Sequence, residues 1–208
     1  MRCLFRRIWF QMKQLPICCI VLVGINVLMF LADIFSGYRL TYMGGEQKTA
    51  ILEQGEYIRL LWAMFLHADI AHLSNNMIVL FFLGSVLEKE TGHLPFLIIY
   101  FLSGLLGNIV SLAVKVMQNS EVMSIGASGA IFGLDGLLLT LVILMPKFRE
   151  TMPLARVFLM ILLSVYDGYV ADHVDNAAHL GGLIIGFVTG MIYVVLRQFF
   201  SKRKEVTW

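Results

Sequence analysis

Two polar residues in otherwise apolar segments have the types needed for covalent catalysis. Ser128 lies between glycines at the start of a long apolar run, and His179 lies in a second apolar run later in the chain. A serine hydroxyl is a poor nucleophile until a neighbouring base takes its proton, and neutral imidazole suits that task near neutral pH. We therefore expect a nucleophile and its general base, provided that the fold brings the two residues together.

Two further side chains are suited to stabilise the charge that such a reaction creates. His72 and Asn76 are four residues apart, so on a helix they share one face. Attack on a carbonyl produces an oxyanion, for which His72, the Asn76 amide and the backbone N–H of Ser128 are candidate donors. No acidic residue is evident at the level of His179, which favours a Ser–His dyad over a triad.

The composition places these residues in a membrane protein. Of the 208 residues, 59% are hydrophobic and 14% are charged, whereas a soluble domain carries about 25% charged residues. The formal net charge of +2 is too small to indicate nucleic-acid binding. Cys18 and Cys19 are adjacent on one expected helix and cannot form a normal disulfide, so we expect no disulfide framework, no zinc motif and no cofactor.

Six apolar segments predict an all-α integral membrane protein with six spans. They lie at about residues 16–35, 71–87, 94–114, 126–145, 154–170 and 177–197, the fifth being near the lower length limit for a hydrocarbon core of about 30 Å. Residues 36–70 mix charges, glycines and aromatic side chains, which predicts a structured loop at the membrane interface. We expect a basic amphipathic tail at 1–15, a membrane domain at 16–197 and a basic tail at 198–208.

The basic residues predict the orientation of this domain. Of the 16 Lys and Arg residues, all but Arg39, Lys48, Arg59 and Lys115 lie in the two tails and in the turns on the same side as the tails. Cytoplasmic loops carry an excess of Lys and Arg, so both termini are expected in the cytoplasm. As a separate expectation, the membrane is that of a bacterial cell.

The same topology predicts that the polar residues meet. Spans two, four and six then run from outside to inside, which places His72, Asn76, Ser128 and His179 within about one to two turns of the outer helix ends. Polar groups at that depth must face a wet cavity or one another.

Small residues predict close helix packing at the same place. Gly129 and Gly133 form a small-xxx-small ridge on span four, and Gly182, Gly186 and Gly190 form one on span six. Ser128 and His179 flank these two ridges.

The spacing of these residues resembles that of the rhomboid intramembrane serine proteases. The three motifs are His67-x4-His72-x3-Asn76, similar to H-x4-H-x3-N; Gly126-x-Ser128-Gly129, similar to G-x-S-G; and Ala178-His179-x2-Gly182-x3-Gly186, similar to A-H-x2-G-x3-G. The resemblance covers nearly the whole chain from about residue 16, with the three motifs in order on three expected helices.

The resemblance implies roles for individual residues. Ser128 would be the nucleophile and His179 the base, His72 and Asn76 would line the oxyanion site, Phe132 would pack against the His179 ring, and Gly126, Gly129 and Gly182 would support the motifs. It also implies a six-helix bundle with a membrane-embedded loop between the first two helices. Its substrates would be single-span membrane proteins, cut near the outer face of the bilayer, and the fifth helix would act as a lateral gate, with a cap loop near 168–176.

Ile58, Asp135 and His67 each lead to a further expectation about structure. Ile58 stands where the family has tryptophan in an aromatic-Trp-Arg signature, which predicts looser anchoring of the loop. Asp135 lies in span four, and we expect either a structural hydrogen bond across the bundle or a role in tuning the cavity. His67 is expected to fix the loop by hydrogen bonding rather than to catalyse.

Other functions are less consistent with the sequence. An inactive relative that binds membrane clients would usually lack the serine or the histidine, and both are present. A small transporter would be expected to show inverted repeats and midplane charges. A metalloprotease would need H-E-x-x-H or an equivalent ligand set, whereas His67 and His72 have no glutamate between them.

Overall fold

The computed structural model describes residues 15–152, 154, 157, 162 and 174–206. Within these residues the secondary structure is helical, apart from an isolated β-bridge between Glu46 and Ser124. The expected tail at 1–15, the fifth span at 154–170 and the cap loop at 168–176 lie wholly or mostly outside the described residues.

Four helical stretches in the described chain are long and apolar enough to cross a membrane. They are Ile17–Phe35, which is α2; Ile70–Thr91, which comprises α6 (Ile70–Val79), the π-helix η2 (Leu80–Gly84) and α7 (Ser85–Thr91); His93–Gln118, which is α8; and Asn176–Phe200 within α12 (Asn176–Val206). These coincide with the predicted first, second, third and sixth spans. The predicted fourth span corresponds to α9 (Ser128–Leu144), which is apolar but shorter.

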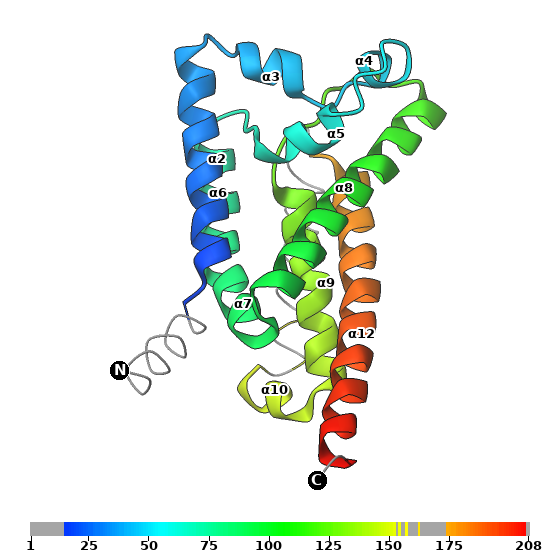
Figure 1. The fold of residues 1–208 in the computed structure, drawn as a ribbon. Helices are drawn as coiled ribbons and strands as arrows, with labels where there is room; N and C mark the ends of the chain where they lie inside the picture. Colours follow the sequence, from blue (N-terminus) through cyan, green and yellow to red (C-terminus); the bar gives the residue numbers. More distant parts are fainter. Residues whose placement is uncertain (1–14, 153, 155–156, 158–161, 163–173, 207–208) are drawn as a thin grey trace.

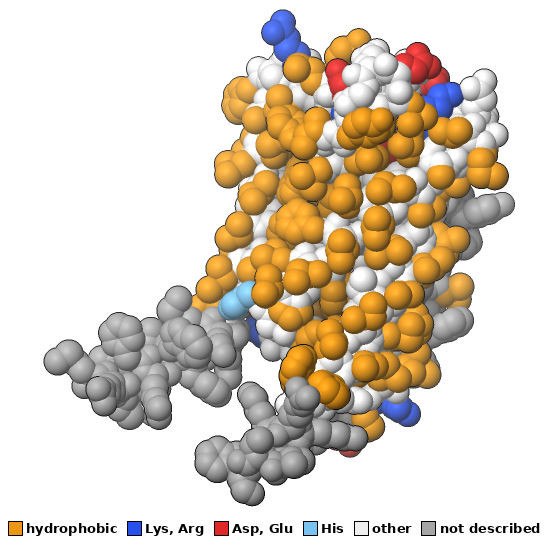
Figure 2. Space-filling view, turned by 45° about the vertical axis from the view of Figure 1, so that its right-hand side comes forward, with side chains coloured by type: hydrophobic (Ala, Val, Ile, Leu, Met, Phe, Trp, Pro, Cys, Tyr) orange, Lys and Arg blue, Asp and Glu red, His pale blue; other side chains and the backbone are white. Residues whose placement is uncertain are grey.

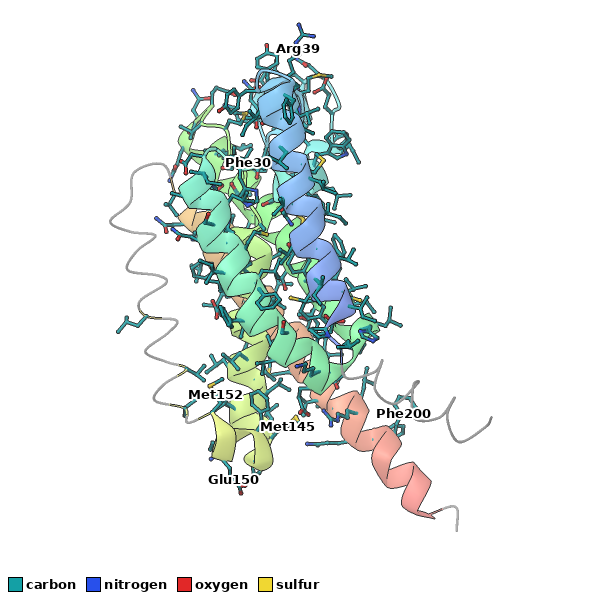
Figure 3. The ribbon with its side chains drawn as sticks, turned by 90° about the vertical axis from the view of Figure 1, so that its left-hand side faces the viewer. Phe30, Arg39, Met145, Glu150, Met152 and Phe200 are labelled. Carbon is teal, nitrogen blue, oxygen red and sulfur yellow. The ribbon has the colours of Figure 1, made fainter. Side chains whose placement is uncertain are left out.

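The helices α2 and α8 run in one direction between the two ends of the bundle, and α6–α7, α9 and α12 run in the other (Figure 1). We call the end with α3 (Arg39–Gly44), α4 (Lys48–Leu52) and α5 (Arg59–Trp62) the α3 end, and the end with α7 and α10 (Pro146–Thr151) the α10 end. Arg39 and Glu150 mark these opposite ends in Figure 3. α9 packs against both α8 and α12, which also contact each other, and it is buried along almost its whole length, as expected of a helix that is apolar on all sides.

The flank of the bundle is apolar. In Figure 2 hydrophobic side chains cover the surface between the ends, and charged side chains gather at the ends themselves. Leu28 and Phe82 are examples, with 67% and 68% of their surface exposed. An apolar flank of spanning length identifies an integral membrane protein.

Arg59 anchors the segment between α2 and α6. Its buried guanidinium donates to the carbonyl oxygens of Tyr42 and Gly45 at 3.0 Å each and pairs with Glu56. The neighbouring Ile58 is exposed and contributes little to this anchor. The arginine therefore holds the loop, and the looser anchoring predicted from Ile58 stays a prediction.

The glycine ridges of α9 and α12 lie against each other. A Cβ atom added to Gly182 would lie 2.0 Å from the carbonyl oxygen of Gly129, and one added to Gly186 would lie 1.9 Å from that of Gly133. Only glycine permits such an approach of two backbones. The predicted close packing is confirmed, and it fixes the spacing of the helices that carry Ser128 and His179.

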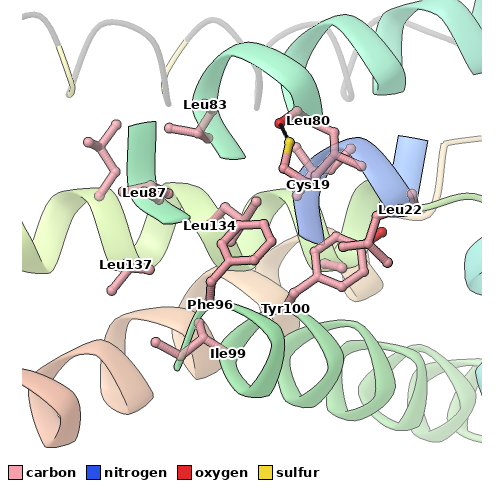
Figure 4. Close-up of a cluster of buried hydrophobic side chains, with 14 of the residues drawn as sticks. Cys19, Leu22, Leu80, Leu83, Leu87, Phe96, Ile99, Tyr100, Leu134 and Leu137 are labelled. Carbon is pink, nitrogen blue, oxygen red and sulfur yellow. Dashed lines mark hydrogen bonds between the residues drawn. The ribbon is translucent and has the colours of Figure 1, made fainter. Parts of the chain in front are cut away.

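At the α10 end, Glu88 ties α2 to the turn between α7 and α8. Its buried carboxylate accepts from the backbone N–H groups of Cys18 and Cys19 at 2.9 and 2.7 Å, and it contacts His93 Nδ1. Cys19 lies in the apolar core of Figure 4, where its thiol donates to the carbonyl of Leu80 at 3.1 Å. These contacts satisfy polar groups that the apolar surroundings would otherwise leave unpaired.

Candidate active site

The segment that leads to Ser128 is clamped on both sides. Glu46 and Ser124 exchange two backbone hydrogen bonds of 2.9 and 3.0 Å, and the N–H of Gly126 donates to the carbonyl of Ala63 at 2.8 Å. Ser128 then begins α9, so its own N–H belongs to the first helical turn, which has no intrahelical acceptor. The local fold therefore presents the hydroxyl of Ser128 beside a free backbone donor.

His72 and Asn76 lie against this segment. A Cβ atom on Gly126 would lie 2.8 Å from His72 Nε2 and 3.6 Å from Asn76 Nδ2, and Gly126 has a φ of +133°. Asp69 caps the first turn of α6 by accepting from the N–H of His72 at 2.8 Å. Asn76 Nδ2 is buried and has no hydrogen-bond partner among the described residues, so it is an available donor.

The His179 ring reaches the same region from α12. It stacks on Phe132 with ring centroids 4.2 Å apart and an interplanar angle of 14°. Phe132 lies one turn after Ser128 on α9, so the stacked imidazole is held beside the turn that carries the hydroxyl. His179 Nδ1 has no acceptor in the part of the chain that the structure describes.

A small pocket opens beside Ser128. Its lining includes Gly126 and Gly129 from the nucleophile segment, Asn108 from α8, and Asp175 and Ala178 from the start of α12. Of the residues predicted for the site, Gly126, Ser128 and Gly129 line this pocket. The others lie beside it through contacts between neighbours: His72 and Asn76 adjoin Gly126, Gly182 adjoins Gly129, and His179 stacks on Phe132. Ser128 and His179 are not hydrogen-bonded to each other here, which is common for catalytic pairs before substrate binds.

His67 has a different role from the one predicted. Its ring is buried and packs edge-on against the His72 ring, with centroids 5.0 Å apart, and neither ring nitrogen makes a hydrogen bond to another described residue. Burial lowers the pKa of His67 to about 3. A neutral His67 therefore supports His72 by packing rather than by hydrogen bonding.

Asp135 does not make the predicted cross-bundle hydrogen bond to any other described residue. Its side chain is buried in α9, with 4% of the residue exposed. Its role is not explained by contacts within the described chain.

Sequence reasoning missed a charged cluster at the α3 end. The sequence predicts only an outer position for Lys115, whereas in the structure Lys115 lies between Asp175 and Glu46 and pairs with both. Burial raises the pKa of Glu46 despite the nearby Lys115. Burial also opposes ionisation of Asp175, but hydrogen bonds from Ser111, Ser124 and Ala178 hold its pKa below the usual range. The helix-capping position of Asp175, four residues before His179, was the signal that could have revealed it.

The side chains of Cys18, Glu88 and His93 are close enough together to consider a metal ion. They lie at the α10 end, away from Ser128. The Glu88 oxygens already accept from the backbone N–H groups of Cys18 and Cys19 and contact His93. We therefore interpret the cluster as a cap for the first turn of α2 rather than as a metal site.

The family model and the related proteins that match this chain indicate the same family. The family model described as "Rhomboid domain" matches residues 54–196. Rhomboid protease GluP of Bacillus subtilis is 35% identical over 170 residues, covering 79% of this chain and 32% of that protein. RHOMBOID-like protein 5 of Arabidopsis thaliana is 36% identical over 157 residues, covering 74% of this chain and 50% of that protein. RHOMBOID-like protein 1 of the same plant is 34% identical over 177 residues, covering 82% and 43% respectively. The chain therefore spans from about a third to half of the length of these relatives.

Proposed function

Because this chain belongs to the rhomboid family, we propose that it is an intramembrane serine endopeptidase with a Ser128–His179 dyad. Its substrates are single-span membrane proteins, cut near the outer face of the bilayer. The observation that carries the proposal is the stacking of the His179 ring on Phe132, one helical turn from Ser128. That contact supports an imidazole held in place for a nucleophile at the start of α9.

The reaction follows from the positions of the donors and the base. Ser128 Oγ attacks the carbonyl carbon of the scissile bond while His179 accepts the hydroxyl proton. The oxyanion of the tetrahedral intermediate accepts from the Ser128 N–H, from Asn76 Nδ2 and from His72. When the C–N bond breaks, His179 gives its proton to the leaving amine, and an acyl-serine remains. A water that is deprotonated by His179 then hydrolyses this ester and restores the serine.

The proposed architecture is the six-span bundle of residues 16–197 with the loop 36–69 embedded at its outer side. The tails 1–15 and 198–208 are cytoplasmic, so the α3 end and the Ser128 pocket face outward. A bacterial cell membrane is the proposed location, since GluP comes from Bacillus subtilis. Membrane protein segments and the surrounding lipid are the proposed partners.

The test uses purified protein in liposomes with a fluorescent single-span substrate that carries a small residue near its outer boundary. Wild type, Ser128→Ala and His179→Ala are compared with and without a chelator. We expect wild type to cleave the substrate at the same rate with and without chelator. Neither Ser128→Ala nor His179→Ala should cleave it. Ser85→Ala is the matched control, because Ser85 lies in α7 at the α10 end and hydrogen-bonds to Cys19 rather than to any group near Ser128.

Two outcomes would contradict the proposal. Cleavage that survives in Ser128→Ala would exclude this serine as the nucleophile. If wild type cleaves none of several such substrates, the client-binding alternative is favoured, and membrane proteins that co-purify with the chain become the next measurement.

A further inference from the structure

A buried charged cluster lies at the α3 end, outside the dyad. Lys115 Nζ lies 2.9 Å from Glu46 Oε1, 2.7 Å from Ser124 Oγ and 3.7 Å from Asp175 Oδ2. The hydroxyls of Ser111 and Ser124 both donate to Asp175 Oδ2. The side chains of Lys115 and Glu46 are 8% and 0% exposed. The Asp175 side chain is 18% exposed. Charges withdrawn from water to this extent need close contacts, and the cluster provides them.

Asp175 also binds the helix that carries His179. Its second oxygen, Oδ1, accepts from the N–H of Ala178 at 2.9 Å, and its backbone carbonyl accepts from the N–H of His179 at 3.1 Å. Asp175 is thus the N-terminal cap of α12, a position at which a carboxylate is favoured both as an acceptor and by the helix dipole.

The other side of the same carboxylate holds the segment that carries the nucleophile. Ser124, which donates to Asp175 Oδ2, lies four residues before Ser128, in the segment paired with Glu46. Lys115 reinforces this link, because it contacts the Ser124 hydroxyl as well as Glu46. One carboxylate therefore connects the start of α12 to the segment before α9.

We propose that Asp175, held by Lys115 and by the hydroxyls of Ser111 and Ser124, is a positioning residue that fixes His179 relative to Ser128. This inference rests on the proposed dyad. Without the carboxylate, the first turn of α12 and the Ser124 segment lose their shared contact, although the glycine contact further along the two helices remains. Misplacement of a catalytic group by about 1 Å costs up to about 100-fold in rate.

The experiment measures kcat and KM for the liposome substrate, together with the rate at which a fluorophosphonate probe labels Ser128. Asp175→Ala is expected to lower kcat and the labelling rate by about 10- to 100-fold, with KM within about twofold of wild type. Asp175→Asn should fold, because asparagine caps helices as well as aspartate does, and should recover only part of the rate. The partial recovery reflects the lost charge, since an amide cannot replace the carboxylate that faces Lys115.

Glu121→Gln is the matched control. Glu121 is an ion-paired acid at the same end, 2.9 Å from Lys48, but it is exposed and contacts neither Ser124 nor α12. We expect its kcat, KM and labelling rate to stay within about twofold of wild type, as for other exposed ion pairs.

Each contrary result has a defined meaning. Wild-type kcat in folded Asp175→Ala would refute the positioning role, and so would a rise in KM alone, which would make Asp175 a substrate contact. Failure of Asp175→Asn to fold would also refute it, because the charge would then serve folding. A wild-type protein that neither cleaves nor labels would refute the dyad itself. A wild type that does both, with Asp175 variants that match it, would refute only the inference drawn here.

Discussion

At the scale of single residues, Gly126 is where the backbone of the nucleophile segment meets the oxyanion donors. Its φ of +133° is rarely adopted by residues with a side chain, and an added Cβ atom would lie 2.8 Å from His72 Nε2. We predict that Gly126→Ala displaces His72 or the segment and lowers kcat by at least about 10-fold. The assay is cleavage of the liposome substrate under saturating conditions.

Gly55→Ala separates this displacement from backbone strain. Gly55 also has a positive φ, +75°, but no atom lies within 4 Å of its added Cβ. Gly55→Ala should lose about 1 kcal/mol of stability and keep its kcat. Equal loss of activity in both variants would show that strain, and not contact with His72, accounts for the effect.

His67 gives a prediction about pH at the same scale. Its pKa is lowered by burial to about 3 in the folded protein, whereas an unfolded histidine titrates near about 6.5. Between these values the unfolded chain binds the extra proton. Folding stability should therefore fall as pH drops below about 6.5, by up to about 1.4 kcal/mol per pH unit from this residue. His67→Phe keeps an aromatic ring and should flatten that slope.

The measurement is thermal unfolding in detergent micelles between pH 7 and pH 5. The difference between wild type and His67→Phe isolates His67 from other titrating groups, including Glu46. The raised pKa of Glu46 acts in the opposite direction, because its buried carboxylate is relieved of charge as pH falls. Parallel pH dependences for the two proteins would mean that His67 is not held neutral by burial.

These residues also show what sequence could predict at this scale. His72 and Asn76 could be placed together because a four-residue spacing on one helix is a local property. The partners of Asp175 could not, because Ser111 and Lys115 lie on α8 and Ser124 lies on the segment after it. Glu46, which pairs with Lys115, comes from a third segment of the chain. Only tertiary packing determines which of those charges are buried together.

At the scale of elements, the contact between α9 and α12 sets the geometry of the site. A Cβ atom on Gly186 would lie 1.9 Å from the carbonyl oxygen of Gly133, and neither backbone can yield without separating the helices. We predict that Gly186→Ala loses about 1–3 kcal/mol of stability, as overpacking does, and also loses cleavage activity. It should do so although Gly186 lies about two turns beyond His179 and does not line the pocket beside Ser128.

Gly24→Ala is the control for Gly186→Ala. Gly24 lies in α2, and no atom lies within 4 Å of its added Cβ. Alanine is the better helix former by about 1 kcal/mol, so this variant should be at least as stable as wild type and fully active. Thermal unfolding and the cleavage assay are run on both variants. Wild-type stability in Gly186→Ala would show that the helices tolerate separation.

Elements were predicted well where periodic or continuous apolar sequence determines them. The bounds of α2 and the ridge of α12 follow from apolar length and from the spacing of small residues, both of which are local. The anchor formed by Arg59 was not predicted. It depends on the chain folding so that the carbonyl groups of Tyr42 and Gly45, which lie earlier in the loop, come within hydrogen-bonding distance of the guanidinium.

At the scale of the whole molecule, the predicted orientation depends on how many Lys and Arg residues lie on each side. Of the four basic residues assigned to the outer side, Lys48 pairs with Glu121, Arg59 with Glu56 and Lys115 with Glu46. These acidic partners change the expected orientation little, because the rule counts Lys and Arg rather than net charge.

The orientation can be measured by labelling two single cysteines in intact cells. The background replaces Cys3 and Cys18 with serine and Cys19 with alanine, because Cys19 is buried in the core. Arg39→Cys then places a thiol in α3, and Glu150→Cys places one in α10, at opposite ends of the molecule (Figure 3). Both positions are exposed. With a membrane-impermeant maleimide, we predict labelling of Arg39→Cys in intact cells and of Glu150→Cys only after permeabilisation. The reverse pattern would turn the Ser128 pocket toward the cytoplasm, and the proposed cut would then lie near the inner face, because the pocket and α3 belong to the same end of the bundle.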